Sequence, residues 1–182
     1  LALFDRDYRS KVEMDKFLAD MQAEGIKCLV FERKEIENYV LSRETLTRAI
    51  EKRQDQRLID SQKLSRRQIE RLILVTSEQF KHETHSQIAS QRAAFLQRSR
   101  TKLDASTIHK ETAVAFERGW RDLDTRLTML PGKEFIAQLS ARLQKTKGFS
   151  ITVNMLVDEM SISEVPADLK AILAKLDDFC RR

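Results

Sequence analysis

The chain has 182 residues, enough for one ordinary domain or for a small domain with an appendage. Hydrophobic residues make up 41% of it, which supports a folded core, and only four glycines and two prolines favour long helices over a loop-rich β fold. The formal net charge is +5, and the two cysteines, Cys28 and Cys180, exclude a disulfide framework or a cysteine-rich metal site. No apolar segment approaches the roughly 20 residues that span a bilayer, and no signal-peptide pattern opens the chain. We therefore expect a cytoplasmic protein with no membrane partner.

The chain opens on a short apolar run, residues 1–4, which is followed by Asp5-Arg6-Asp7. Such a run is typical of a buried strand, and Asp5 and Asp7 can converge if the extended geometry continues past the end of the strand. Paired carboxylates of this kind suit Mg²⁺ or Mn²⁺. The alternative is that Asp5 caps a turn and that Asp7 is solvated. Because no Met, cap or turn precedes the run, we expect a fragment with at least one further strand upstream.

A helix and a second strand are predicted next. Residues 11–24 carry apolar side chains at helical spacing, and Gly25 ends that pattern. Residues 26–31 form a second apolar run rich in β-formers, so strand, helix and strand make a parallel βαβ unit. The segment 35–41 mixes acidic and apolar residues and is expected to turn into a helix.

Residues 43–128 are predicted to be helical, because no Gly or Pro occurs from residue 26 to residue 118. We expect two to four helices there, one of them opened by a capping box of Ser65 and Gln68. Residues 101–106 are expected to interrupt the helices. The predicted fold class is thus α/β but mostly helical. It comprises a partial βαβ core in residues 1–42, a large helical insertion over 43–128 and a C-terminal helical part in 129–182.

The helical insertion also carries the basic excess of the chain, with 18 Lys and Arg against 12 Asp and Glu between residues 43 and 128. Arg66, Arg67 and Arg71 are our candidate contacts to the phosphates of a nucleic acid. The alternative is a solvated surface of mixed charge, which is common on helices.

Several other conspicuous side chains favour structural interpretations. His82 and His85 share one face of a predicted helix, but no third ligand accompanies them, so we interpret them as surface residues. His109 has no supporting partner nearby in the sequence. Trp120, which follows Gly119 at a helix end, is interpreted as a core anchor and not as a platform for stacking bases.

The turn Pro131-Gly132 opens a further helix, and Lys133 follows it directly. A cation is mildly unfavourable at the start of a helix, where the helix dipole is positive. This misfit indicates a catalytic contact from Lys133 to a phosphate or to a pentavalent transition state. The alternative is an ordinary exposed lysine in a turn.

The last third of the chain continues as helix. Gly148 is predicted to end the helix that Pro131-Gly132 opens. Residues 149–160 have features of both strand and helix, and we favour a helix with Ser150 or Thr152 as its cap. Pro166 is expected in the first turn of a final helix.

Four segments occur in an order that is familiar from one protein family. They are Asp5-Arg6-Asp7-Tyr8-Arg9, Arg33-Lys34-Glu35-Ile36-Glu37-Asn38-Tyr39-Val40-Leu41, Leu130-Pro131-Gly132-Lys133, and Val165-Pro166-Ala167-Asp168-Leu169 with the stretch up to Phe179. In this order they resemble the Toprim-like domain at the C-terminal end of OLD-family ATPases. These are the overcoming-lysogenization-defect nucleases and their relatives in anti-phage defence. The resemblance covers both ends of the chain, and the middle matches only in being helical.

The resemblance implies a metal-dependent phosphodiesterase that lies behind an ABC-type ATP-binding domain. Its site uses a Glu on an earlier strand, the D-x-D pair and often a Lys, so Asp5 and Asp7 would bind Mg²⁺ or Mn²⁺ and Lys133 would be catalytic. Glu37 either completes this metal cluster, orients Arg33 or a backbone amide, or fixes the corner between strand and helix. The earlier Glu strand and a Walker A motif are not among these residues, so ATP is expected in an upstream domain.

Two functions follow from this interpretation. The first is the C-terminal part of an ATP-dependent, metal-dependent nuclease, inactive as this segment alone, whose partners are DNA or RNA, the ABC-type ATPase domain and a second copy of the chain. The second is a non-catalytic module for interaction or dimerisation. Converging carboxylates at Asp5 and Asp7 would favour the nuclease, whereas separated or ion-paired carboxylates would favour the module.

Overall fold

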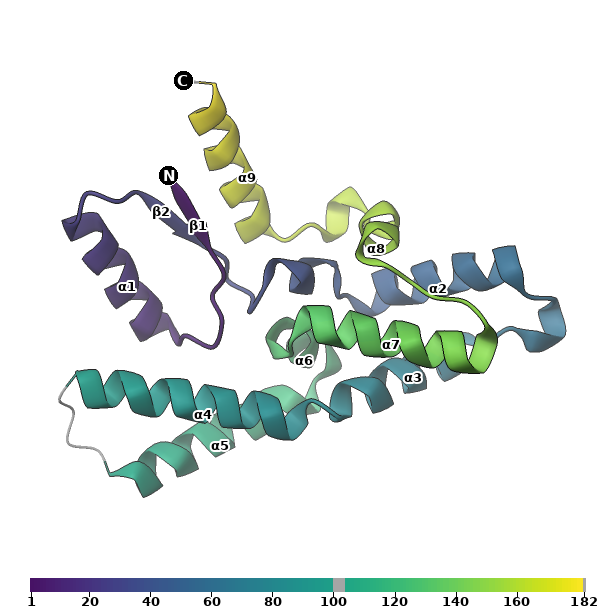
Figure 1. The fold of residues 1–182 in the computed structure, drawn as a ribbon, viewed down its shortest axis with the longest axis horizontal. Coiled ribbons are helices and arrows are strands. Elements are labelled where there is room, and N and C mark those ends of the chain that lie inside the picture. The colour runs from purple at the N-terminus through teal and green to yellow at the C-terminus, as the bar shows by residue number, and fades with distance from the viewer. Residues whose placement is uncertain (100–103, 182) are drawn as a thin grey trace.

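The computed structural model describes residues 1–99 and 104–181 (Figure 1). The described part is mostly helical, with one small sheet of two parallel strands. In chain order its elements are β1 (Ala2–Phe4), α1 (Lys11–Ala23), β2 (Cys28–Val30), η1 (Ile36–Val40), α2 (Arg43–Arg57), η2 (Asp60–Gln62), α3 (Arg66–Glu78), α4 (Lys81–Arg98), α5 (Ala105–Arg121), α6 (Leu123–Met129), α7 (Gly132–Lys147), α8 (Val153–Glu159), η3 (Ile162–Glu164) and α9 (Ala167–Cys180). None of the helices described is both long enough and apolar enough to cross a membrane.

The two strands are adjacent and parallel, as predicted, with Leu3 opposite Leu29. Helix α1 connects them, and it begins at a capping box in which Ser10 and Glu13 satisfy each other's backbone N–H groups. Gly25 follows α1 with φ of 74°, a left-handed conformation that lets the chain turn back into β2. The mostly helical α/β class is therefore confirmed at this level.

Most buried apolar side chains belong to one core that lies among the helices. It unites residues of η1, α2, α3, α5, α6, α7 and α8, and Ile50, Ile73, Leu127 and Leu139 are among its fully buried members. The core includes side chains from each of the three predicted segments, residues 1–42, 43–128 and 129–182. Trp120 is buried in it and stacks on Phe116, as expected of a core anchor.

A second, smaller cluster joins the two ends of the described chain. Leu29, Phe31 and Tyr39 pack there against Ile172 of α9. Figure 1 shows α9 rising beside the two strands. Glu32 N also donates to the hydroxyl of Tyr39, at 3.0 Å, so the segment after β2 is fixed between the sheet and α9.

The helical middle differs from its prediction in number, because residues 43–128 contain five α-helices in the part that the structure describes, not two to four. Helices α3 and α6 begin without a neighbouring Gly or Pro. Their N-caps Ser65 and Asp122 instead accept hydrogen bonds from backbone N–H groups in the first turn of each helix. The predicted capping box of Ser65 and Gln68 is confirmed. The predicted break over 101–106 lies partly outside the described residues, and α5 begins after the cap Asp104.

Helices α4 and α5 form an antiparallel hairpin that reaches beneath α1 (Figure 1). At the C-terminal side, Gly148 ends α7 with φ of 74°, and Thr152 caps α8, which confirms the helical interpretation of that segment. The predicted final helix is present as α9, but Pro166 is its N-cap and lies just before the first turn in which it was expected.

Candidate metal centre at the carboxyl ends of the strands

Residues from three distant segments meet where the two parallel strands end. Asp5 follows β1, and its Oδ1 accepts a hydrogen bond of 3.2 Å from Ile36 N in the segment after β2. In that segment, Glu37 Oε1 lies 3.5 Å from Lys133 Nζ at the start of α7. The structure thus brings Asp5, Glu37 and Lys133 to one edge, the edge where parallel α/β sheets bind ligands.

Asp7 does not extend the strand. Strand β1 ends at Phe4, and Asp7 adopts a left-handed backbone conformation with φ of 52°. Its carboxylate pairs with Arg9 Nη1 at 3.0 Å, and its N–H donates to the Lys34 carbonyl at 2.9 Å. The condition for Asp5 and Asp7 to point the same way, extended geometry past the strand end, is therefore not met. Asp5 instead caps the first N–H of η1, which is the alternative that the sequence left open.

Arg6 explains why the chain turns at this point. Its Nη1 donates to the Glu32 carbonyl at 2.7 Å, and its Nε donates to the Arg9 carbonyl at 2.7 Å. These two bonds tie the turn after β1 to the residue that precedes Ser10 and to the segment that follows β2. The turn is thus fixed by the residue between the two aspartates.

Asn38, whose side chain is fully buried, holds the segment after β2 against the end of α6 and the turn that precedes α7. Its Nδ2 donates to the carbonyls of Leu127 and Leu130, at 2.8 and 3.0 Å, and its Oδ1 accepts from Glu35 N at 2.9 Å. Gly132 permits this approach, because a Cβ there would lie 3.1 Å from Glu37 Cβ and 3.3 Å from Asn38 N. The Glu-Ile-Glu-Asn and Pro-Gly-Lys motifs therefore form one structural unit.

Glu35 caps α7, a role that the sequence interpretation did not assign to it. Its Oε2 accepts from Gly132 N at 3.1 Å and lies 3.5 Å from Lys133 N, and its other oxygen pairs with Lys34. A helix that starts at Pro131-Gly132 has no side-chain acceptor of its own. That deficiency was the one sequence feature that could have indicated an external cap.

Glu37 is the most unusual carboxylate of the site. Its side chain is only 13% exposed, and while Oε1 pairs with Lys133, Oε2 is buried with no hydrogen-bond partner. Lys133 itself is 65% exposed, so its ammonium is free to turn. One carboxylate oxygen of Glu37 is therefore buried without a partner beside the ends of the strands.

Lys34 is a further charged group that the sequence interpretation did not select. Burial lowers the pKa of Lys34, although Glu134, Asp7 and Asp5 lie near enough to favour its charged form. It lines a polar cavity of about 580 Å³ together with Asp7, Glu83 and Glu134. The cavity lies between the strand ends, α4 and α7, so α4 and α7 also face the candidate centre.

The three candidate arginines lie elsewhere. Arg66, Arg67 and Arg71 are exposed on the first turns of α3, and Arg66 Nε lies 3.9 Å from Glu70. That end of α3 lies near the C-terminal end of α7, where Lys147 Nζ donates to the Gln62 carbonyl at 2.7 Å (Figure 1). Helix α7 has 16 residues and so spans roughly 24 Å. The arginines are therefore about one helix length from Lys133.

The histidines show a clustering that the sequence did not indicate. The hairpin of α4 and α5 places the rings of His85 and His109 5.3 Å apart, and His82 lines the same cavity of about 370 Å³. Burial and the neighbouring His109 lower the pKa of His85, and its Nε2 is buried without a partner. Within residues 1–99 and 104–181, however, no group of three or more His, Cys, Asp or Glu side chains could hold a metal ion.

The strand edge therefore holds the carboxylates of Asp5 and Glu37 and the movable Lys133, while Asp7 is paired with Arg9. Comparisons with models of protein families, with curated proteins and with solved structures find no match for this chain.

Proposed function

We propose that this chain contributes part of a divalent-metal site that cleaves phosphodiester bonds of a nucleic acid, in a Toprim-like domain related to the OLD-family nucleases. The observation that carries the proposal is the unused oxygen of Glu37 beside Asp5 and Lys133. A buried carboxylate oxygen without a partner is costly, and a ligand of opposite charge removes that cost. The resemblance implies Asp5 and Lys133 for the nuclease site, and completing the metal cluster is one of the roles that the sequence left open for Glu37.

Mg²⁺ or Mn²⁺ fits the chemistry of these donors, because both ions prefer carboxylate oxygens and retain several waters. Asp5 and Glu37 would hold the ion. Asp7 would join them only if both its ion pair with Arg9 and its left-handed turn opened. When bound, the ion supplies a Lewis acid that activates water and neutralises charge on the phosphate. The resemblance implies a further Glu ligand on another strand.

Lys133 is suited to hold a phosphate oxygen. Its backbone is fixed, since Glu35 faces the N–H groups of Gly132 and Lys133, whereas its side chain is exposed. If Glu37 turns its Oε1 to a metal ion, the Lys133 ammonium loses its partner and can face the anionic substrate instead. A cation placed in this way stabilises the charge that develops on the phosphate during cleavage.

The basic helix α3 would contact phosphates that flank the cleaved bond. Arg66, Arg67 and Arg71 are exposed and lie about 24 Å from the start of α7, which corresponds to roughly seven nucleotide steps of 3.4 Å. The other parts of the proposal rest on the resemblance alone. They are ATP in an ABC-type domain, assembly into a homo-oligomer, a cytoplasmic location and a role in anti-phage defence.

The proposal is tested by Mn²⁺ binding to this chain, measured by calorimetry and by the electron paramagnetic resonance of free Mn²⁺. Glu37→Gln keeps the shape of the side chain but removes its charge, so we expect Mn²⁺ affinity to fall at least about tenfold. Asp15→Asn on the exposed face of α1 is the matched control and should leave the affinity unchanged. In the full-length parent, Asp5→Ala should abolish Mn²⁺-dependent cleavage and preserve ATP hydrolysis. Cleavage within a few-fold of wild type would contradict the assignment.

A non-catalytic interaction module is the second candidate, and one observation favours it. Asp7 pairs with Arg9 and Glu37 pairs with Lys133, so two of the three predicted ligands already have cationic partners. On this hypothesis the strand edge is a structural joint between β1, η1 and α7. The wild-type chain would then bind no Mn²⁺, and Glu37→Gln would change only its stability.

A further inference from the structure

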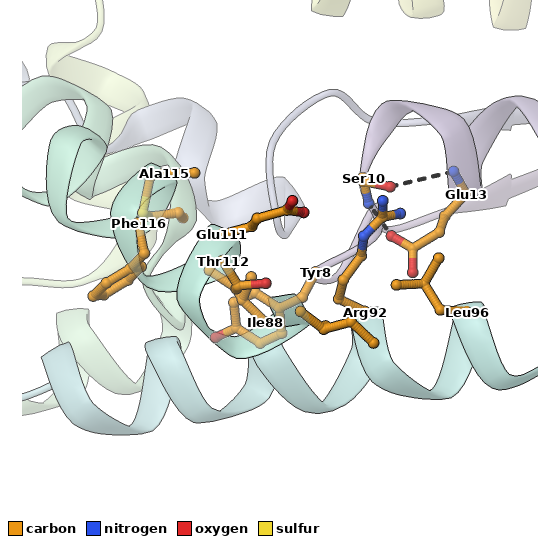
Figure 2. A pocket seen from close by; sticks show the side chains of 12 residues that line it. Tyr8, Ser10, Glu13, Ile88, Arg92, Leu96, Glu111, Thr112, Ala115 and Phe116 are labelled. Carbon is orange, nitrogen blue, oxygen red and sulfur yellow. Dashed lines mark hydrogen bonds between the residues drawn. The ribbon is translucent and has the colours of Figure 1, made fainter. Parts of the chain in front are cut away.

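A mostly apolar cavity of about 420 Å³ lies between the start of α1 and the hairpin of α4 and α5 (Figure 2). Ile88 and Leu96 of α4 and Phe116 of α5 supply much of its apolar wall. The volume is within the range of roughly 300–1,000 Å³ that is typical of small-molecule sites. Tyr8 lines both this cavity and the polar cavity beside Asp7 and Lys34, but Asp5, Glu37 and Lys133 do not line it.

One wall of the cavity carries a buried carboxylate. Glu13 is only 4% exposed, and its Oε2 accepts the N–H of Ser10 in the capping box of α1. Its Oε1 is buried and has no hydrogen-bond partner. Figure 2 shows Ser10 and Glu13 together at one end of the cavity, facing side chains of α4. An unpaired carboxylate oxygen in such surroundings favours a hydrogen-bond donor with a positive charge.

The other charges that line the cavity leave this oxygen available. Glu111 of α5 is exposed, and Arg92 of α4 is the single cation among the lining residues. Figure 2 shows Arg92 reaching from α4 toward Ser10 and Glu13, but no ion pair joins Arg92 to either carboxylate in the described part of the chain. The lining therefore carries one more negative than positive group.

We propose that this cavity binds a small organic cation, a primary ammonium group on a compact apolar body. The ammonium donates to Glu13 Oε1, and the body packs on the apolar wall at the same end of the cavity, which includes Leu96. Arg92 competes for the same carboxylate and limits the affinity. This proposal is independent of the metal site, because none of these residues lies at the strand ends.

Calorimetry measures binding in this cavity. The probes are benzylamine and its neutral counterpart benzyl alcohol. We expect saturable binding of benzylamine at an affinity at least about tenfold higher than that of benzyl alcohol, because only the amine forms a charge-assisted hydrogen bond.

Glu13→Gln is the decisive variant, since Gln also serves in a capping box and the start of α1 is preserved. It should lower benzylamine affinity about tenfold and leave benzyl alcohol binding unchanged. Glu111→Gln, which removes the exposed carboxylate, should change benzylamine affinity by less than about twofold. Arg92→Gln should raise it by removing the competing cation.

Three results would overturn the proposal. The first is equal affinity of the wild-type chain for both probes. The second is an equal loss of benzylamine affinity in Glu13→Gln and in Glu111→Gln. The third is no binding of benzylamine to the wild-type chain. The third result would mean that Arg92 closes onto Glu13 in solution. The comparison of the two probes on the wild-type chain remains decisive even if Glu13→Gln proves unstable.

Discussion

Asn38→Ala should be among the most damaging single substitutions in this chain. The side chain of Asn38 is fully buried and joins the segment after β2 to the turn that precedes α7. Alanine removes its carboxamide and leaves the carbonyls of Leu127 and Leu130 and the N–H of Glu35 without these partners. Water cannot readily replace the carboxamide in a site without solvent access.

The expected cost follows from the three hydrogen bonds that are lost. A typical intramolecular hydrogen bond contributes roughly 1 kcal/mol to stability, so the free energy of unfolding should fall by about 3 kcal/mol. For a chain of this size, that change corresponds to a decrease in Tm of roughly 6–12 °C. Because Asn38 fixes the segment that carries Glu37, Mn²⁺ binding should weaken in the same variant.

Urea denaturation followed by circular dichroism measures the loss of stability. The matched control is Asn154→Ala on α8, because Asn154 is exposed and is the only other asparagine of the chain. It should change the free energy of unfolding by less than about 0.5 kcal/mol. A loss below about 1 kcal/mol for Asn38→Ala would refute the reasoning, since the three hydrogen bonds would then contribute little to holding η1 against the turn that precedes α7.

Two further predictions concern the helical middle of the chain. The pKa of His85 is lowered by burial and by the nearby His109, so the unfolded chain takes up a proton near pH 6.5 before the folded chain does. The contribution of neutral His85 to the free energy of unfolding should therefore be fully present above about pH 6.5 and should be lost as the pH falls below it. The Tm of His85→Gln should then decrease less between pH 7.5 and 5.5 than the Tm of the wild-type chain. Equal decreases in the two proteins would contradict this. Neutralising Arg66, Arg67 and Arg71 together should flatten the salt dependence of nucleic-acid binding by up to about three units of slope, since each phosphate contact contributes ~0.9. The change in slope should be smaller than three units, because the three side chains do not share one helix face and Arg66 lies near Glu70. An unchanged slope would indicate that these arginines form a solvated or protein-binding surface.

The two functional interpretations differ in what they require of Glu37 and Asp7. The nuclease proposal needs the ion pairs of Asp7 with Arg9 and of Glu37 with Lys133 to open when a metal ion binds. Asp7 and Arg9 are partly or fully exposed, and exposed ion pairs are weak, so opening that pair costs little. Breaking the ion pair of Glu37 and Lys133 costs more free energy than breaking that of Asp7 and Arg9, because the Glu37 carboxylate is buried. A metal ion must therefore take the place of the lysine beside that carboxylate.

Much of the local structure could be predicted from the sequence because its causes lie within a few residues. Gly25 and Gly148 end their helices by adopting a left-handed conformation that other residues rarely adopt. Ser65 and Thr152 start theirs by accepting a hydrogen bond from an N–H three residues ahead. The number of helices in the middle was wrong because helices can also end where a cap such as Asp122 offers a new start, without Gly or Pro.

The candidate centre depended on contacts that no local pattern contains. The sequence by itself determined which motifs carry carboxylates and a lysine, and it placed Asp5 and Glu37 after the two strands. Only the tertiary structure decided that Glu37 pairs with Lys133, because that contact requires α7 to pack on η1 at Gly132, where a larger residue would collide with Glu37 and Asn38. The turn at Asp7 was likewise decided by Arg6, whose partner carbonyl at Glu32 lies on the neighbouring segment. Such contacts become favourable only when the whole chain has folded, since burial of the core supplies the free energy that brings distant polar groups together.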